Sequence, residues 1–127
     1  MSVLRTVRRR RGRDQAAQVS RLHARAVVDR DAGRLSPALA AGEHALKIVE
    51  HGPGEFSPAA AVVWNTVGTI REAMCDYDGA GSAYRRATAI LDRHKDDDSV
   101  LPARITVTSS SARLHRTLGR LDAAGRS

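Results

Sequence analysis

The sequence predicts an all-α fold, a solenoid of antiparallel helix pairs with about five helices and a partial sixth. Three observations support this prediction. Apolar residues recur at helical rather than alternating spacing along the 127-residue chain, which holds 21 alanines. Glycine and proline interrupt this pattern at intervals. One segment is also similar to a second segment 42 residues further on, and periods of about 20 to 50 residues are typical of stacked helical repeats.

The composition indicates a single domain that folds without a covalent staple. A chain of this length can bury a modest core, and its one cysteine, Cys75, excludes a disulfide framework and a four-cysteine zinc site. We expect a reducing, cytoplasmic environment. No segment approaches the roughly 20 apolar residues of a membrane span, and no apolar segment of a secretory signal follows the basic start MSVLRTVRRRRGR. We therefore expect no membrane association.

The net charge of +7 is concentrated at the start of the chain. Residues 1–13 hold six arginines and no acid, which leaves a net charge of +1 for residues 14–127. We expect residues 1–13 to be a disordered basic arm and residues 14–127 to be the helical repeat domain. Clustered arginines bind nucleic-acid phosphates, and the candidates here are Arg8, Arg9, Arg10 and Arg11. No aromatic residues are interleaved for base stacking, so a solvated tail or a non-native leader remains an alternative.

The first two helices are expected over about residues 14–31 and 36–51. The first carries Val19, Leu22 and Ala26 on one face. It stops before Gly33, which can adopt the left-handed conformation that follows a helix end. Ser36 and Pro37 form a capping serine followed by proline at the first helical position, so they predict the second start.

Three further helices and a partial one follow. Residues 52–54, Gly-Pro-Gly, break the chain, and Ser57-Pro58 then opens a third helix to Met74. Asp78 opens a fourth helix to Leu91. Either Asp98 or Ser99 caps a fifth helix over about residues 100–118, Gly119 ends it, and Asp122 caps a partial sixth. Residues 105–111 are β-branched or serine, which leaves a strand as an alternative there.

An internal repeat relates these helices. Residues 33–49 align with residues 75–91, and residues 119–124 repeat the turn at an offset of 44. The units span about residues 19–56, 61–99 and 105–127, and the last unit is incomplete. The paired residues are Leu35 with Tyr77, Ala38 with Ala80, Ala41 with Ala83, Ala45 with Ala87, Ile48 with Ile90 and Val49 with Leu91.

The middle unit resembles the tetratricopeptide repeat (TPR) family, whose pattern is W-x2-L-G-x2-Y followed by A-x3-F, A and P. The corresponding positions are Trp64, Val67, Gly68, Arg71, Ala80, Tyr84, Ala87 and Asp92, of which five or six of eight fit the pattern; Asp92 stands where proline is usual. We expect Gly68 and Ala80 to let the two helices approach closely, while Trp64 and Tyr84 fill the gaps. The long units and their G-P-x-x-x-P linker are similar to the kinesin-light-chain type, which is abundant in large bacterial signalling proteins. The alternative is an unrelated helical bundle.

The TPR resemblance implies that the first helix of each unit lines a groove for a peptide or a partner helix. In the middle unit the stripe facing this groove is Asn65, Thr69 and Glu72. The equivalent residues are His23, Val27 and Arg30 in the first unit and Ser109, Arg113 and Arg116 in the third. An asparagine with inward-facing arginines suits the clamping of a carboxylate. The alternative is a solvated polar face that binds no ligand.

No motif for catalysis, a cofactor or a metal is present in the sequence. Residues 109–111 are serines near His115, but no elbow turn exposes a nucleophile. The five histidines lack the spacing of a zinc site, and the acids of residues 92–98 lack the spacing of a calcium loop. We therefore expect a noncatalytic scaffold that binds a protein or peptide. The alternatives are a nucleic-acid-associated regulatory protein and a fragment of a longer array, and we also expect self-association through an open C-terminal end.

Overall fold

The computed structural model describes residues 2–52 and 54–125, apart from the side chains of Ser2 and Arg8, and the described part is helical with no strand. Its elements are α1 (Ser2–Asp31), α2 (Leu35–Glu50), α3 (Pro58–Ala73), α4 (Tyr77–Asp92), the 3₁₀ helix η1 (Asp98–Val100) and α5 (Leu101–Gly125). The all-α prediction is confirmed, and the strand alternative for residues 105–111 is wrong. Pro53 of the predicted linker and residues 126–127 of the last predicted unit lie outside the described residues.

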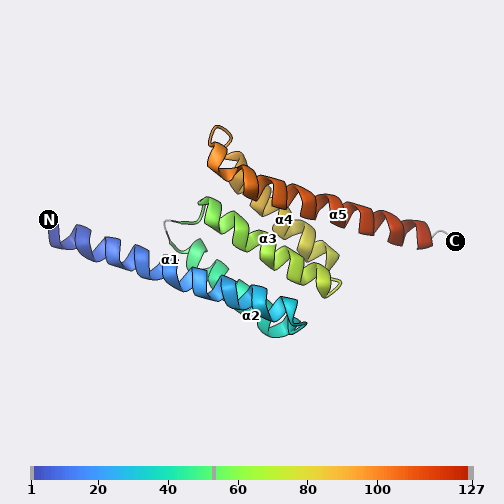
Figure 1. Cartoon of the computed structure of the whole chain (residues 1–127), viewed down its shortest axis with the longest axis horizontal. Coiled ribbons are helices and arrows are strands. Elements are labelled where there is room, and N and C mark those ends of the chain that lie inside the picture. The colour runs from blue at the N-terminus through green and yellow to red at the C-terminus, as the bar shows by residue number, and fades with distance from the viewer. Residues whose placement is uncertain (1, 53, 126–127) are drawn as a thin grey trace.

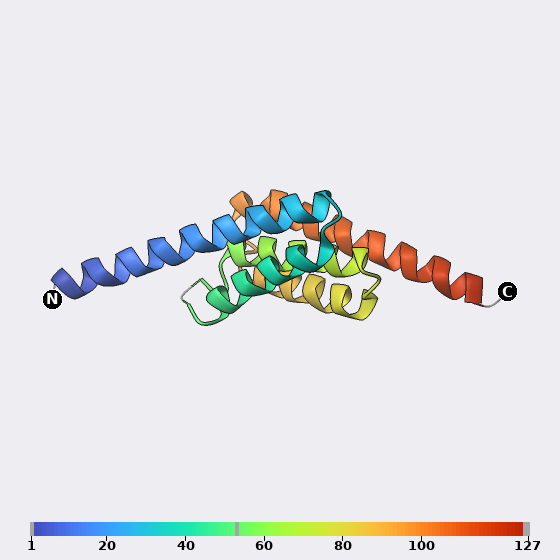
Figure 2. The same cartoon turned by 90° about the horizontal axis from the view of Figure 1, so that it is seen from below.

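The five α-helices pack in two layers. Successive helices are antiparallel neighbours in Figure 1, and α3 packs against each of the other α-helices. The view in Figure 2 places α1 and α5 on one side of the molecule and α2 and α4 on the other. Lying between these two sides, α3 contacts α1 and α5 as well as α2 and α4. The first half of α1 and the last half of α5 extend beyond the other helices at opposite ends (Figure 1).

Two turns have the same geometry at the predicted offset of 42 residues. Gly33, between α1 and α2, has φ of +80°, and Cys75, between α3 and α4, has φ of +64°. Each lies in a turn that ends a helix. In both turns the next residue donates a backbone hydrogen bond to the carbonyl five residues earlier: Arg34 N to Asp29 O and Asp76 N to Arg71 O, both at 2.8 Å. The repeated unit is therefore a helix hairpin. Cys75 is exposed in this turn.

The helix start agrees with the sequence at α3 and differs by one to three residues at α2, α4 and α5. Ser57 accepts a hydrogen bond from Ala60 N at 3.2 Å and so caps α3, as predicted. Asp76 rather than Asp78 caps α4, and Asp97 rather than Asp98 or Ser99 caps the η1–α5 segment. Ser36 is not a cap, because α2 begins at Leu35 after Arg34. A capping aspartate one or two residues earlier, and a proline within the first turn, are equally compatible with helix initiation.

Small residues allow the helices to pack closely. The residues predicted to be structural behave as expected, since Ala80, Tyr84 and Ala87 are buried and Gly68 lies against the Tyr84 ring. Trp64 is half-buried beneath the guanidinium of Arg86, which lies 5.2 Å from the ring centroid. Gly42 occupies the position equivalent to Tyr84 in the first hairpin, and there the side chain of Val67 fills the space. In the first unit the Val67 side chain therefore fills the space that the aromatic ring fills in the second.

The prediction of a disordered arm differs from the structure, in which residues 2–13 continue α1 as one helix of 30 residues. The predicted start near Asp14 is therefore wrong. Arginine is a good helix former and no proline interrupts residues 2–31, so the packed part of α1 can propagate the helix outward. None of the described helices contains an apolar stretch of the length that a bilayer span requires.

The predicted turn at Gly119 and the partial sixth helix are absent from the described residues, because α5 runs without a break from Leu101 to Gly125. Gly119 lies in open surroundings, with no heavy atom near the position of an added Cβ. A glycine within a helix costs only about 1 kcal/mol relative to alanine.

Candidate functional site

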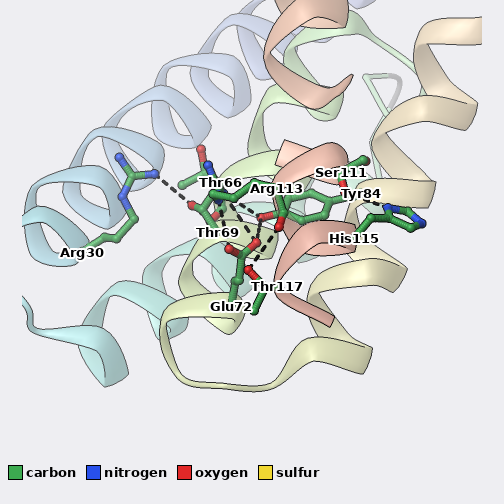
Figure 3. A network of polar contacts seen from close by, with 9 residues as sticks. All are labelled: Arg30, Thr66, Thr69, Glu72, Tyr84, Ser111, Arg113, His115 and Thr117. Carbon is green, nitrogen blue, oxygen red and sulfur yellow. Dashed lines mark hydrogen bonds and ion pairs between the residues drawn. The ribbon is translucent and has the colours of Figure 1, made fainter. Parts of the chain in front are cut away.

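The candidate site is the polar face that α1, α3 and α5 share. Two hydrogen bonds link α1 to α3 on this face. His23 Nε2 lies 2.8 Å from the Thr66 hydroxyl, and Arg30 Nη1 donates to the Thr69 hydroxyl at 2.9 Å. Thr69 in turn donates to the backbone carbonyl of Thr66 at 2.7 Å, as Figure 3 shows. The two pairs lie about two helical turns apart along α1 and about one turn apart along α3, and together they set the registration of α1 on α3.

A second polar cluster joins α3, α4 and α5 around Glu72 (Figure 3). The Tyr84 hydroxyl donates to Glu72 Oε1 at 2.9 Å, and Arg113 Nε donates to Glu72 Oε2 at 3.0 Å. Burial, assisted by the Glu72 carboxylate, raises the pKa of the Tyr84 hydroxyl far above its ordinary value of about 10. The hydrogen bond to Glu72 raises the pKa of Arg113 as well. Tyr84 is therefore a permanent donor, and Glu72 is a charged acceptor shared by two helices.

The structure brings four of the eight predicted groove residues together, as two contacts between neighbouring helices. Arg30 contacts Thr69, and Glu72 contacts Arg113. Each contact joins the third position of one stripe to the second position of the stripe in the next unit, so the lateral pairing repeats along the layer. Ser109 and Arg116 are exposed on α5. The sequence reasoning missed Thr66, whose i, i+3 spacing to Thr69 on a polar side of α3 is the signal that could have identified it.

Asn65 departs from the expectation of an exposed groove residue. Its side chain is 93% buried, with a relative exposure of 7%, and its Oδ1 has no hydrogen-bond partner among the described residues. An unpaired buried amide oxygen costs about 1–3 kcal/mol relative to a paired one. Asn65 Oδ1 is therefore a buried acceptor without a hydrogen bond, and it lies beneath the middle of the face.

His23 is a neutral component of the face near neutral pH. Partial burial lowers the pKa of His23 below its ordinary value of about 6.5, and the neighbouring Arg30 lowers it further. A neutral imidazole can both donate and accept, which suits its pairing with the Thr66 hydroxyl. Positive charge on the α1 side of the face consequently comes from Arg30.

The remaining candidates do not form a site with one another. The arm residues Arg9, Arg10 and Arg11 are exposed on the projecting half of α1, and the side chain of Arg8 lies outside what the structure describes. His115 Nδ1 donates to the backbone carbonyl of Ser111 at 2.7 Å rather than pairing with a serine hydroxyl. Within the described residues, no three His, Cys, Asp or Glu side chains come together as metal ligands.

Comparisons of the chain with protein-family models, with curated proteins and with solved structures find no match.

Proposed function

We propose that this protein is a noncatalytic interaction module, a short TPR-like solenoid whose face of α1, α3 and α5 binds an extended peptide or a partner helix. The observation that carries the proposal is the repeated lateral pairing on that face, Arg30 with Thr69 and Glu72 with Arg113. Stacked hairpins with equivalent contacts between units present one continuous row of polar groups, and such a row matches an elongated partner better than a compact molecule.

The charges of the face favour an acidic partner. Its predicted groove residues include Arg30, Arg113 and Arg116 but only one acid, Glu72. Arg113 remains 48% exposed although it is paired with Glu72. Because a guanidinium carries five donors, Arg113 can bind Glu72 and a ligand carboxylate together. We therefore expect peptides rich in aspartate or glutamate, or with an accessible C-terminal carboxylate, to bind on this face.

The proposal can be tested by selecting binders from a displayed library of ten-residue peptides and measuring their affinity for the full chain by calorimetry. We expect acidic peptides to be enriched, and we expect Arg116→Glu to weaken the enriched peptides about tenfold, the range of one lost charge pair. Asn65→Leu should raise the melting temperature by about 4 °C and leave peptide affinity unchanged, since it removes an unpaired buried acceptor worth about 1 kcal/mol that a ligand on the face does not reach.

Lys47→Glu is the matched control for Arg116→Glu. Lys47 is exposed on α2, in the opposite layer, and the substitution changes the net charge by the same amount. It should leave peptide affinity unchanged. A library that yields no acidic binders, or equal losses for Lys47→Glu and Arg116→Glu, would show that the face of α1, α3 and α5 is not the binding surface.

A second candidate function rests on the projecting half of α1. The structure makes this segment a helix with exposed Arg5, Arg9, Arg10, Arg11 and Arg13, and residues 1–13 contain no acid. Successive residues of a helix point about 100° apart, so these guanidinium groups surround the axis rather than sharing one face. Such a helix suits sequence-independent contacts with the phosphates of nucleic acid.

Phosphate binding predicts a steep dependence of affinity on salt. For the full chain and a short DNA duplex, the triple variant Arg9→Gln, Arg10→Gln, Arg11→Gln should reduce the slope of log K against log salt by about 2–3, since each contact contributes about 0.9. Fluorescence anisotropy measures this slope. The matched triple Arg85→Gln, Arg86→Gln, Arg93→Gln removes three exposed arginines from α4 and its C-terminal cap and should leave the slope unchanged. Equal effects of the two triples would exclude a role for the helix.

A further inference from the structure

An open groove of about 660 Å³ lies between α4 and α5, on the side of the molecule away from the polar face. Its floor includes the buried Leu114, and its walls include Tyr77, Ala89, Ser111 and the partly exposed Leu118. Within the described residues, no other helix lies over this groove. Apolar side chains in an open groove are a common feature of surfaces that a further helix covers.

The repeat shows what kind of element fits there. The equivalent pair in the preceding unit is α2 and α3, and α4 packs over that pair. Arg71 of α3 donates to Glu43 of α2 and to the Gly79 carbonyl of α4, both at 3.4 Å. Val49 of α2 shares a core cluster with Leu91 of α4. By this equivalence the α4–α5 groove fits one amphipathic helix that runs antiparallel to α5.

The last part of α5, residues 114–125, has the features of such a helix. We call it the α5 extension. Leu114, Leu118 and Leu121 follow one another at spacings of four and three residues, which places them in one stripe. Leu114 is buried against Tyr84, whereas Leu118 and Leu121 are 42% and 50% exposed. Figure 1 shows the α5 extension passing beyond the end of α4, so the apolar stripe continues where α4 no longer covers it.

The charges of the α5 extension complement those at the start of α4 at one position. The extension carries Arg116, Arg120 and Asp122, while Asp76 caps α4 and Asp78 lies in its first turn beside the groove, which Arg85 also lines. A helix antiparallel to α5 runs parallel to α4, because α4 and α5 are themselves antiparallel (Figure 1). In that direction, pairing Leu118 with its counterpart places Arg120 of a second α5 extension near the first turn of α4, where Asp78 lies.

We propose that a second copy of the chain fills this groove with its α5 extension, so that two copies form a symmetric dimer. Helix α5 both lines the groove and carries the α5 extension. A two-fold axis near Leu118 therefore lets each copy cover the exposed leucines of the other. Because both grooves are then filled, the assembly closes at two copies. The projecting half of α1 is the other available helix, but its insertion would join copies head to tail without closure. Two helix ends bury less than the roughly 1,600 Å² of a standard interface, so we expect a dissociation constant of about 10 µM.

The test is sedimentation velocity of the full chain under reducing conditions, from about 1 µM to about 200 µM, a range that brackets the expected dissociation constant. We expect a reversible monomer–dimer equilibrium. The double variant Leu118→Glu, Leu121→Glu should weaken the dimer at least tenfold, because it buries two acids in the apolar seam. Its melting temperature at low concentration should match that of the parent chain, since both leucines are exposed in one copy.

Ile105→Glu is the matched control. Ile105 is exposed on the opposite side of α5, so this substitution should leave the dimer intact.

A cross-link locates the axis. In a Cys75→Ser background, Leu118→Cys should form a disulfide-linked dimer on mild oxidation, whereas Ile105→Cys should form much less. The proposal is overturned by a chain that stays monomeric at all concentrations, by assembly that grows beyond two copies, or by a dimer that Leu118→Glu, Leu121→Glu does not weaken. Equal cross-linking at positions 105 and 118 would also overturn it.

Discussion

Gly68→Val is expected to lower the free energy of unfolding by about 3 kcal/mol and the melting temperature by about 12 °C. A Cβ at this position would lie 2.5 Å from Cε1 of Tyr84, and the two further methyl groups of valine increase the overlap. The ring cannot move aside easily, because Tyr84 is buried and its hydroxyl is held by Glu72. The gain in helix propensity over glycine, below about 1 kcal/mol, does not offset this overlap. Thermal and urea denaturation followed by circular dichroism measure the effect.

Gly119→Val is the control for Gly68→Val, because Gly119 also lies within a helix but has open space around it. This variant should be as stable as the parent chain or slightly more stable. Replacing the Tyr84 ring by a smaller side chain should relieve the overlap with the valine side chain at position 68. The double variant Gly68→Val, Tyr84→Leu should therefore lose less stability than the sum of the losses of the two single variants. Additive effects in that double variant would contradict a direct Gly68–Tyr84 contact.

Glu72→Ala is expected to reduce stability by about 2–3 kcal/mol, the value of hydrogen bonds to a largely buried charge. The Glu72 side chain is 13% exposed and joins three helices, since it accepts from Tyr84 of α4 and Arg113 of α5. Its removal leaves the Tyr84 hydroxyl without this acceptor in a mostly buried position. Urea denaturation of the variant measures the loss, and a double-mutant cycle with Arg113→Met isolates the share that the ion pair contributes.

Asp92→Ala provides the comparison for Glu72→Ala. Asp92 also pairs with an arginine of α5, at 3.1 Å from Arg104 Nη1, but its side chain is 49% exposed. Exposed ion pairs contribute about 0–1 kcal/mol, so this variant should be nearly as stable as the parent chain. If both variants lost the same stability, the burial of Glu72 and its bond to Tyr84 would not be the source of the effect.

The helix hairpins were predictable because they depend on local signals. The alignment of residues 33–49 with residues 75–91 paired Gly33 with Cys75, and these two positions share a positive φ. Ser57 followed by Pro58 located the start of α3 for a similar reason, since a cap acts within one helical turn. Spacing in the sequence also predicted that Asn65, Thr69 and Glu72 share one side of α3. It could not show that Asn65 is buried, because burial depends on the neighbouring helices.

The sequence by itself determined the all-helical fold, the period of the repeat and the concentration of charge before residue 14, because each follows from residue types over short distances. Tertiary structure decided the rest. It pairs Arg30 with Thr69 and Glu72 with Arg113, contacts that span about 40 residues of sequence. It also decided the course of α5. The turn sequence at Gly119 forms no turn. A helix ends at such a sequence only when tertiary contacts of the following residues offset the loss of backbone hydrogen bonds.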